Sequence, residues 1–412
     1  MAGLMIVLVG SLLTLLAPVF ALAQSPADLD FQARCHGPGV LRCVDFDTTA
    51  WINYEQSTNR DWGKNYGLQF GGPLSNGSRT TIDTTIKASG AGSIKHVFPA
   101  GVTSVNDGVM DFVAHFTPCP GAGNNPTNCF ANQYTNQNLQ TGDQIFIQWR
   151  ARYSPEMLVQ SNWIDDNHGG LPIDDFGNKM GSLGLADLPT CRDGGAAPAD
   201  SHNCPTMCSA QGMEVVMTGG KNIDMILAYS NCAGIEGFRG FSSVSGTGGW
   251  NYENQISTCD NNSGYTGCRK YVANEWLTFK VWFKMGTFNQ YDSEFRFWMG
   301  RQGQPLELLV DCRANGPSRC DNDFSNKGQG PGGGGKTIRV NLTDENTGQP
   351  ITGPYRVGKI HLTPYTTNAG HVLQTATVWY DELIISTQDI ADPGASTGPV
   401  IRPMAPANLR VQ

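Results

Sequence analysis

Residues 274–299 read NEWLTFKVWFKMGTFNQYDSEFRFWM, and two runs in this stretch alternate between core-forming apolar residues and a second, mostly basic or aromatic set. The apolar positions are Phe279, Val281, Phe283 and Met285 in the first run, and Phe295, Phe297 and Met299 in the second. Because successive side chains of a β-strand lie on opposite faces, each run buries one face. The stretch therefore predicts two strands that share a hydrophobic core.

Similar alternation recurs along the chain in short runs bounded by Gly, Pro, Asn and Asp, and long runs with the helical period are absent. This pattern predicts an all-β fold, a two-sheet antiparallel β-sandwich. The clearest predicted strands are residues 93–98, 108–116, 144–153, 213–218, 223–229, 276–285, 294–299, 358–363 and 376–386. The polar stretches 118–140, 165–203, 233–269 and 312–336 are expected to be long loops.

The composition excludes several classes of protein. Only 16% of the 412 residues are charged and the net charge is −8, which argues against a coiled coil and against nucleic-acid binding through overall charge. The 50 glycines and 23 prolines argue against a helical bundle. The chain therefore is expected to be globular, with no nucleic-acid partner.

The first 23 residues are apolar, carry no charge and end in Ala21-Leu22-Ala23. They predict a cleaved signal peptide and a secreted or extracellular protein, or a periplasmic or cell-surface one. An uncleaved anchor is the alternative, because the segment has no Lys or Arg. No later segment is apolar enough to span a membrane. We expect a sandwich domain at residues 24–391 and a Pro-rich linker or tail at residues 392–412.

All twelve cysteines follow the signal segment, and an even number in a secreted chain predicts disulfide bonds. Cys204, Cys208 and His202 would suit zinc, but no second cluster has ligand spacing, so disulfides are favoured. Four expected pairs are close in sequence: Cys35–Cys43, Cys119–Cys129, Cys259–Cys268 and Cys312–Cys320. The other four, Cys191, Cys204, Cys208 and Cys232, allow three pairings that the sequence does not distinguish.

The strand faces opposite the apolar ones are rich in basic and aromatic residues, although the protein is acidic overall. These positions are either a solvated outer face or a groove, in which Trp rings stack on sugars and cations bind acidic groups. Exposed Trp is unfavourable on a plain surface, so the pattern favours the groove. The predicted substrate-binding residues are Trp282, Trp298, Arg296, Gln148, Arg152 and Lys280.

The stretch 274–299 resembles a strand pair of the concanavalin A-like jelly rolls, a superfamily that includes secreted polysaccharide lyases and laminin-G-like domains. Residues 44–47 (VDFD), 146–155 (FIQWRARYSP) and 376–386 (ATVWYDELIIS) are similar to other strands of that superfamily. The motifs are short and mainly structural, so the resemblance implies the fold more than the activity.

The same resemblance implies a structural calcium ion that ties the first strand to the last. Asp45, Asp47 and Asp381 are the matching positions, and carboxylate oxygens suit Ca²⁺. The alternative is that Asp381 only caps a turn. We expect no organic cofactor.

Two chemistries suit a catalytic groove. A lyase that cleaves a uronic-acid polysaccharide by β-elimination needs a cation at the sugar carboxylate, a base and an acid. Arg150 or Lys284 would be the cation, and His115, His168 or a Tyr would transfer protons. A hydrolase needs two carboxylates, and the E-x-D-x-x-E strand of jelly-roll glucanases is absent.

The favoured function is therefore a lyase that acts on an extracellular acidic polysaccharide. A non-catalytic carbohydrate-binding, laminin-G-like module is one alternative, and it would bind saccharide without cleaving it. A structural component of an extracellular or cell-surface assembly is another, and it would self-associate. The sequence leaves the glycan open, and also which face of the sheet is concave.

Overall fold

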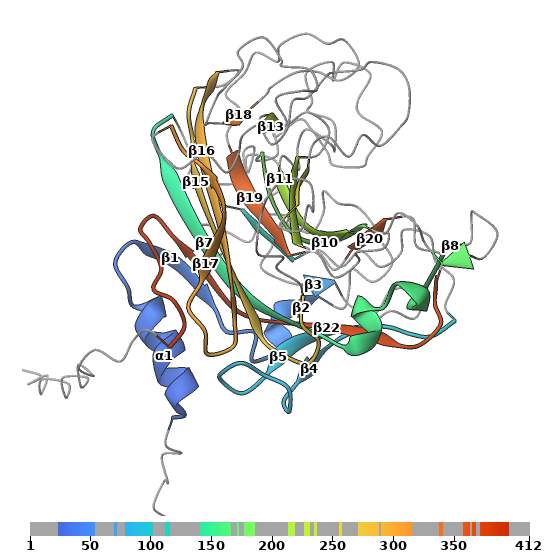
Figure 1. The fold of residues 1–412 in the computed structure, drawn as a ribbon. Coiled ribbons are helices and arrows are strands. Elements are labelled where there is room, and N and C mark those ends of the chain that lie inside the picture. The colour runs from blue at the N-terminus through green and yellow to red at the C-terminus, as the bar shows by residue number, and fades with distance from the viewer. Residues whose placement is uncertain are drawn as a thin grey trace, which may run out of the picture.

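The computed structural model describes residues 24–53, 70–71, 79–101, 112–115, 141–165, 171–172, 177–185, 213–218, 226–230, 235–236, 255–257, 271–287, 290–314, 338–340, 357–362, 365–367 and 371–394. Most of them belong to antiparallel sheets (Figure 1). The described helices are α1 (Pro26–Cys35) and the short 3-10 helices η1 (Thr49–Trp51), η4 (Pro155–Leu158) and η5 (Gln160–Asn162). The predicted signal segment lies outside these residues.

The larger sheet has ten strands in the order β13-β18-β16-β15-β7-β22-β5-β4, with β1 paired to β22 and β17 paired to β16. Their bounds are β13 (Ile235–Glu236), β18 (Ile338–Val340), β16 (Tyr291–Arg301), β15 (Leu277–Lys284), β7 (Gln144–Tyr153), β22 (Ala376–Ser386), β5 (Ser93–Phe98), β4 (Arg79–Asp83), β1 (Val40–Val44) and β17 (Glu307–Cys312).

The second sheet has the order β14-β12-β11-β10-β19-β6, and β20 also pairs with β10. Its strands are β14 (Gln255–Ser257), β12 (Ile226–Ser230), β11 (Met213–Thr218), β10 (Gly177–Leu185), β19 (Val357–Leu362), β6 (Phe112–His115) and β20 (Tyr365–Thr367). Two small sheets pair β2 (Ile52–Asn53) with β3 (Phe70–Gly71), and β21 (His371–Val372) and β9 (Leu171–Pro172) with β8 (Trp163–Asp165). The second sheet lies on the concave side of the larger sheet, and α1 lies on the convex side (Figure 1).

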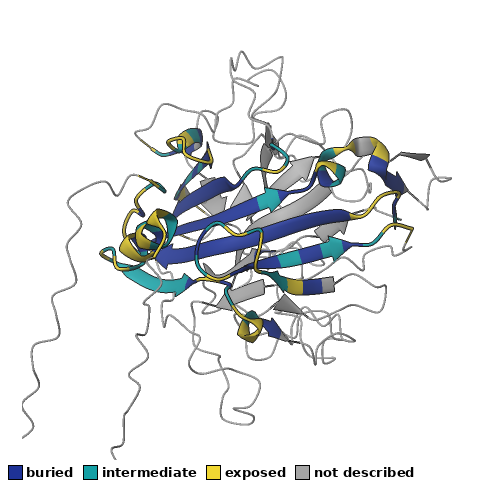
Figure 2. Ribbon diagram, turned by 90° about the horizontal axis from the view of Figure 1, so that it is seen from below, coloured by how far each residue is buried: buried dark blue, intermediate teal, exposed yellow. Residues whose placement is uncertain are grey.

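The main core fills the space on the concave side of the larger sheet. Trp149, Phe279, Phe283 and Phe297 are buried there, and Leu362 of β19 joins the same cluster from the second sheet. Each such side chain contributes about 1.5–3 kcal/mol when buried. The central strands are buried along most of their length (Figure 2). The predicted β-sandwich is confirmed.

The strand predictions agree closely with the structure. Strands β5, β7, β11 and β22 have the predicted bounds, and β6, β12, β15, β16 and β19 differ only at their ends. The other strands, which include β1, β4 and β17, are not predicted by the sequence. Two stretches expected to be loops also contain strands: β9 and β10 lie in 165–203, and β13 and β14 lie in 233–269. Glycine occupies three of the nine positions of β10, so β10 lacks a clear alternating pattern.

Helix α1 is specified locally, although the strand pattern does not predict it. Ser25 accepts a hydrogen bond from the backbone N–H of Asp28, and Asp28 accepts one from the N–H of Ser25, which forms a capping box. Pro26 occupies the first turn, where its missing N–H costs nothing. These signals cover only ten residues, so they are weak beside the strand pattern.

The convex face of the larger sheet carries a second, smaller core. Phe31 of α1 and Ile390 of the segment 387–394 pack there against Phe146, Trp282 and Ile384 of the sheet. The helix and this C-terminal segment therefore cover part of a face that the alternation alone would leave free.

One predicted disulfide is confirmed: Cys35 and Cys43 are bonded and join α1 to β1. Cys312 is also disulfide-bonded, but its expected partner Cys320 lies outside the described residues, as do the other eight cysteines. Their pairings stay predictions. None of the helices in the described ranges has the length and apolar character of a membrane span.

Candidate functional site

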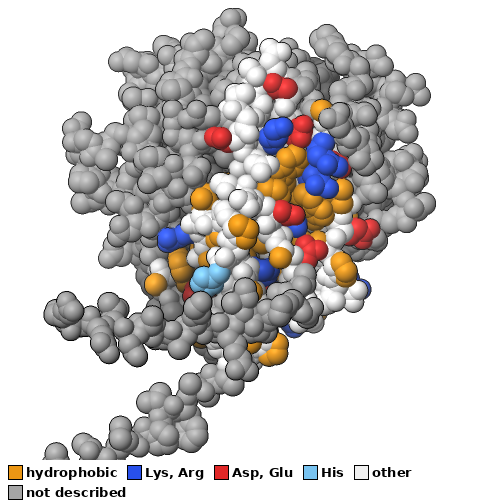
Figure 3. Space-filling model, turned by 90° about the vertical axis from the view of Figure 1, so that its left-hand side faces the viewer, with side chains coloured by type: hydrophobic (Ala, Val, Ile, Leu, Met, Phe, Trp, Pro, Cys, Tyr) orange, Lys and Arg blue, Asp and Glu red, His pale blue; other side chains and the backbone are white. Residues whose placement is uncertain are grey.

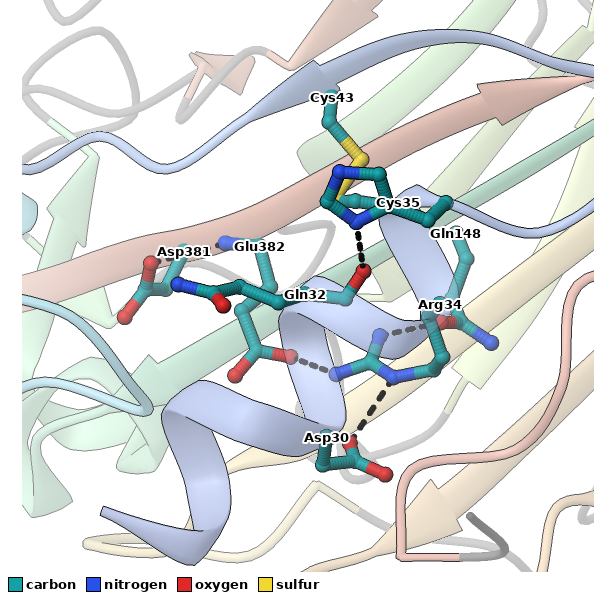
Figure 4. The surroundings of a disulfide bond; sticks show 9 residues. Asp30, Gln32, Arg34, Cys35, Cys43, Gln148, Asp381 and Glu382 are labelled. Carbon is teal, nitrogen blue, oxygen red and sulfur yellow. Dashed lines mark hydrogen bonds and ion pairs between the residues drawn. A yellow bond between two sulfur atoms is a disulfide. The ribbon is translucent and has the colours of Figure 1, made fainter. Parts of the chain in front are cut away.

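Arg150 and Gln148 lie in a buried polar layer between the larger sheet and α1. Arg34 of α1 donates hydrogen bonds to Gln148 Oε1 (2.7 Å), to Glu382 Oε2 and to Asp30 Oδ2 (2.9 Å), as Figure 4 shows. Arg150 Nη1 lies 3.3 Å from Glu382 Oε1, and only 7% of Arg150 is exposed. Arg150 therefore binds an internal carboxylate, Glu382, which also binds Arg34 of α1.

Lys280 and Trp282 are also covered. The Lys280 ammonium donates to Asp389 Oδ1 (3.1 Å), to the Ile390 carbonyl oxygen (3.0 Å) and to Asp392 Oδ1 (3.1 Å). Trp282 is 8% exposed, and its Nε1 donates to Gln144 Oε1 (3.0 Å). Several of the basic and aromatic residues that suggested an open groove thus lie beneath the cover that α1 and residues 387–394 provide.

The remaining predicted residues of this face are more accessible. The Lys284 side chain is 43% exposed and lies 4.0 Å from Glu294, which is a weak ion pair. Arg296 and Trp298 are partly exposed and stack on one another. Arg152 is half-buried, and its Nε is buried without a hydrogen-bond partner.

The three predicted calcium ligands accept hydrogen bonds from the chain itself. Asp45 Oδ1 accepts from Trp51 Nε1 (2.9 Å), and Asp47 Oδ1 accepts from the N–H of Gly92 (2.9 Å). Asp381 Oδ2 accepts from the N–H of Ala88 (2.7 Å), and burial raises the pKa of its carboxyl well above the usual range. In the part of the chain that the structure describes, these carboxylates do not gather into a metal-binding group. The calcium ion stays a prediction.

The second sheet brings ionisable residues together across several strands. Leu362 of β19 is buried in the main core, so its neighbour His361 lies on the opposite face of the sheet. The register partner of His361 on β10 is Ser182. Ser182 pairs with Glu214 of β11, and Glu214 pairs with Tyr229 of β12. Directly paired residues of antiparallel strands share a face.

A second register row lies beside this one. Lys359 is two residues before His361 on the same face, and it pairs with His115 of β6. Paired Cα atoms lie about 4.5–5.5 Å apart, and positions two apart on a strand lie about 7 Å apart. Lys359 is therefore flanked by two histidines. We call the six residues of the two rows the second-sheet cluster: His115, Ser182, Glu214, Tyr229, Lys359 and His361.

Of the four predicted catalytic residues, His115 belongs to this cluster, while Arg150 and Lys284 lie on the far side of the larger sheet. His168 lies outside the described residues. Sequence reasoning missed Glu214, although it is the one charged residue in the strand Met213–Thr218. An isolated carboxylate in an otherwise apolar run was the available signal.

Comparisons with known proteins found similar solved structures at low sequence identity. No protein-family model and no curated protein matches the sequence. The chain is similar to an endo-β-1,4-glucuronan lyase from the fungus Trichoderma reesei (TM-score 0.40, 10% identity, covering 86% of this chain and 99% of that one). It is also similar to a PL-14 alginate lyase from Aplysia kurodai (TM-score 0.41, 10% identity, covering 85% and 99%).

A third similar structure is the catalytic domain of a glycoside hydrolase family 131 protein from Coprinopsis cinerea (TM-score 0.30, 12% identity, covering 77% and 82%). At such scores the likeness carries no argument about activity. The sheets described above carry the assignment instead: the chain has the two-sheet antiparallel β-sandwich fold predicted from its resemblance to the concanavalin A-like jelly rolls.

Proposed function

We propose that the protein is a secreted polysaccharide lyase that cleaves a uronic-acid polysaccharide by β-elimination at the second-sheet cluster. The observation that carries the proposal is the placement of Lys359 between His115 and His361 on one face of the second sheet. This set contains a cation and two groups that exchange protons near neutral pH. These are the groups that the reaction requires.

Each residue has a role in the proposed reaction. Lys359 neutralises the sugar carboxylate, which makes the adjacent C5 proton more acidic. Neutral His361 takes that proton, the C5–H electrons form the C4–C5 double bond, and the C4–O4 bond breaks. Protonated His115 gives its proton to the leaving oxygen. The products are an unsaturated uronic acid end and a free hydroxyl end.

Hydrolysis fits this face less well. Glycoside hydrolases commonly use two carboxylates, whereas Glu214 is the only acidic residue among the described positions of this face.

The cluster is long enough for a polymer. One register row crosses five strands, from His361 through Ser182, Glu214 and Tyr229 to Gln255. At a spacing of about 4.8 Å between strands, it extends about 19 Å, which gives room for several sugar units.

The test is the ultraviolet absorbance of the new C4–C5 double bond, measured with the full chain on alginate, pectate, glucuronan and glycosaminoglycans. One polymer should give a rising signal. We expect His361→Ala and Lys359→Ala to lower kcat by about 10²–10⁴. Arg301→Ala is the control, because Arg301 is an exposed residue that pairs with Glu275 at an edge of the larger sheet.

Three results would contradict the proposal. A flat trace on every polymer, with saccharide binding retained, would favour a non-catalytic carbohydrate-binding module, and self-association without binding would favour a structural role. Loss of turnover in Lys284→Ala but not in Lys359→Ala would place the reaction on the convex face of the larger sheet instead.

A further inference from the structure

Part of the convex face of the larger sheet stays accessible beyond α1 and residues 387–394. Strands β15, β16 and β17 meet there, and their partly exposed side chains include Lys284, Arg296, Trp298 and Arg313. Figure 3 shows basic side chains beside hydrophobic ones on this side of the molecule. The face lies across the larger sheet from the second sheet (Figure 1).

The Arg296 side chain is held in place but makes no hydrogen bond with the residues that the structure describes. Its guanidinium carbon lies 4.4 Å from the centre of the Trp298 ring, and 26% of its side chain is exposed. Its Nε is buried without a hydrogen-bond partner and lies 3.8 Å from Asp311 Oδ1, which is beyond hydrogen-bonding distance. The stacked ring thus fixes a guanidinium that donates no hydrogen bond to the described part of the chain.

Asp311 is already occupied by another arginine. Arg313 donates to both of its carboxylate oxygens, from Nε (2.6 Å) and from Nη2 (2.6 Å). Two guanidiniums therefore share one fully buried carboxylate, so these three groups together carry one positive charge, while Glu294 also attracts Arg313 and Asp389 also attracts Arg296. Desolvation and then repulsion from Arg313 lower the pKa of Arg296. The nearby Asp389 is bonded to Lys280 and makes no ion pair with Arg296.

We propose that Arg296 and Arg313, with the Trp298 ring behind Arg296, form a second contact site for an acidic polysaccharide. The Arg296 guanidinium binds a sugar carboxylate through two parallel N–H donors, as arginine commonly does with planar carboxylates. The excess charge of the Arg296–Asp311–Arg313 group complements that carboxylate. This site does no chemistry; it holds the polymer on the surface opposite the second-sheet cluster.

This inference deepens the proposed function, because it takes the same class of polymer. The test measures affinity for an immobilised uronic-acid polysaccharide, by affinity electrophoresis of the full chain. Arg296→Gln should weaken binding about tenfold, because a charged hydrogen bond contributes about 1.5–3 kcal/mol and about 1.4 kcal/mol corresponds to a factor of ten. Arg296→Lys, which keeps the charge but not the two-donor geometry, should lose part of this affinity.

The matched control is Lys95→Gln. Lys95 also lies on the larger sheet, above the Trp379 ring at 5.9 Å, but Asp83 pairs with it at 3.7 Å. This variant removes the same charge and should bind nearly as wild type. Equal losses in Lys95→Gln and Arg296→Gln would mean that only net charge matters, and unchanged binding of Arg296→Gln would also overturn the proposal.

Two further arms separate this site from the proposed lyase activity. His361→Ala should lose turnover and keep its polymer affinity. Arg296→Gln should keep its kcat on short oligosaccharides and need a higher polymer concentration to reach half of the maximal rate.

A sulfated polymer that lacks carboxylates should bind more weakly than a carboxylated one. If no polymer is cleaved but Arg296→Gln still weakens binding, the lyase proposal fails and the contact site stands. Absence of wild-type binding to every uronic polymer would overturn the contact site.

Discussion

At the scale of single residues, His96 makes the stability of the protein depend on pH. It is fully buried on β5, with Nδ1 3.2 Å from Thr80 Oγ1 and no partner for Nε2. Burial disfavours the imidazolium and lowers the pKa of His96 to about 3. Between the unfolded pKa of 6.5 and this value, only the unfolded state binds the proton, so the free energy of unfolding falls as pH falls.

We expect this residue to contribute a slope of about 1.4 kcal/mol per pH unit through that interval. Asp381 acts in the opposite direction, because its raised pKa favours the folded state in acid. The comparison is therefore between wild type and His96→Leu, by urea unfolding from pH 8 to pH 4. The variant should show the flatter loss of stability below about pH 6.5. Parallel curves would mean that His96 is protonated in the folded protein.

At the scale of elements, helix α1 depends on Arg34 for its attachment to the sheet. The side chains of Arg34 and Glu382 are each 1% exposed, so this is a buried ion pair. Arg34→Ala should lower the free energy of unfolding by about 1–3 kcal/mol, because it leaves Gln148 Oε1 and one Glu382 oxygen buried without a donor, while Arg150 still pairs with Glu382. Arg301→Ala breaks a mostly exposed pair and should change little. Chemical denaturation measures both, and similar losses would contradict the anchoring role.

At the scale of the whole molecule, residues 389–394 contact the folded unit, and residues 392–394 lie beyond the domain end that the sequence predicts at residue 391. Lys280 finds its three acceptors there, and the N–H of Gly394 donates to Asp30 of α1 (2.9 Å). A chain that ends after Gly394 should therefore be as stable as the full chain. One that ends after Gln388 should lose about 1.5–3 kcal/mol, because Ile390 no longer packs on the convex face, and Lys280 loses its three acceptors and becomes exposed to water.

Thermal and urea unfolding of the two truncated chains check this expectation. If the shorter chain does not fold, Ile390→Ala in the full chain removes the same apolar contact and should lose part of this stability. Equal stability of the two truncated chains would contradict the role of residues 389–392.

The strands could be predicted because alternation is a local property of the sequence. It assigned the residues of β7, β15 and β16 to the correct faces. It could not show that α1 and residues 387–394 cover Gln148, Lys280 and Trp282, because the covering residues are distant in sequence. For the same reason, no local pattern announces that His115 pairs with Lys359; that register is fixed by the packing of the second sheet.

The pairing of β1 with β22 also has a consequence for biosynthesis. Arg34 and Glu382 are 348 residues apart, so the N-terminal helix and strand leave the ribosome long before their partners exist. At about 5–20 residues per second, that interval is roughly 20 to 70 s. Throughout it, the apolar face of α1 and the unpaired edge of β1 are open to wrong partners. A nascent chain that stalls before Ala376 cannot close its sheet, and it should depend on chaperones until the last strand arrives.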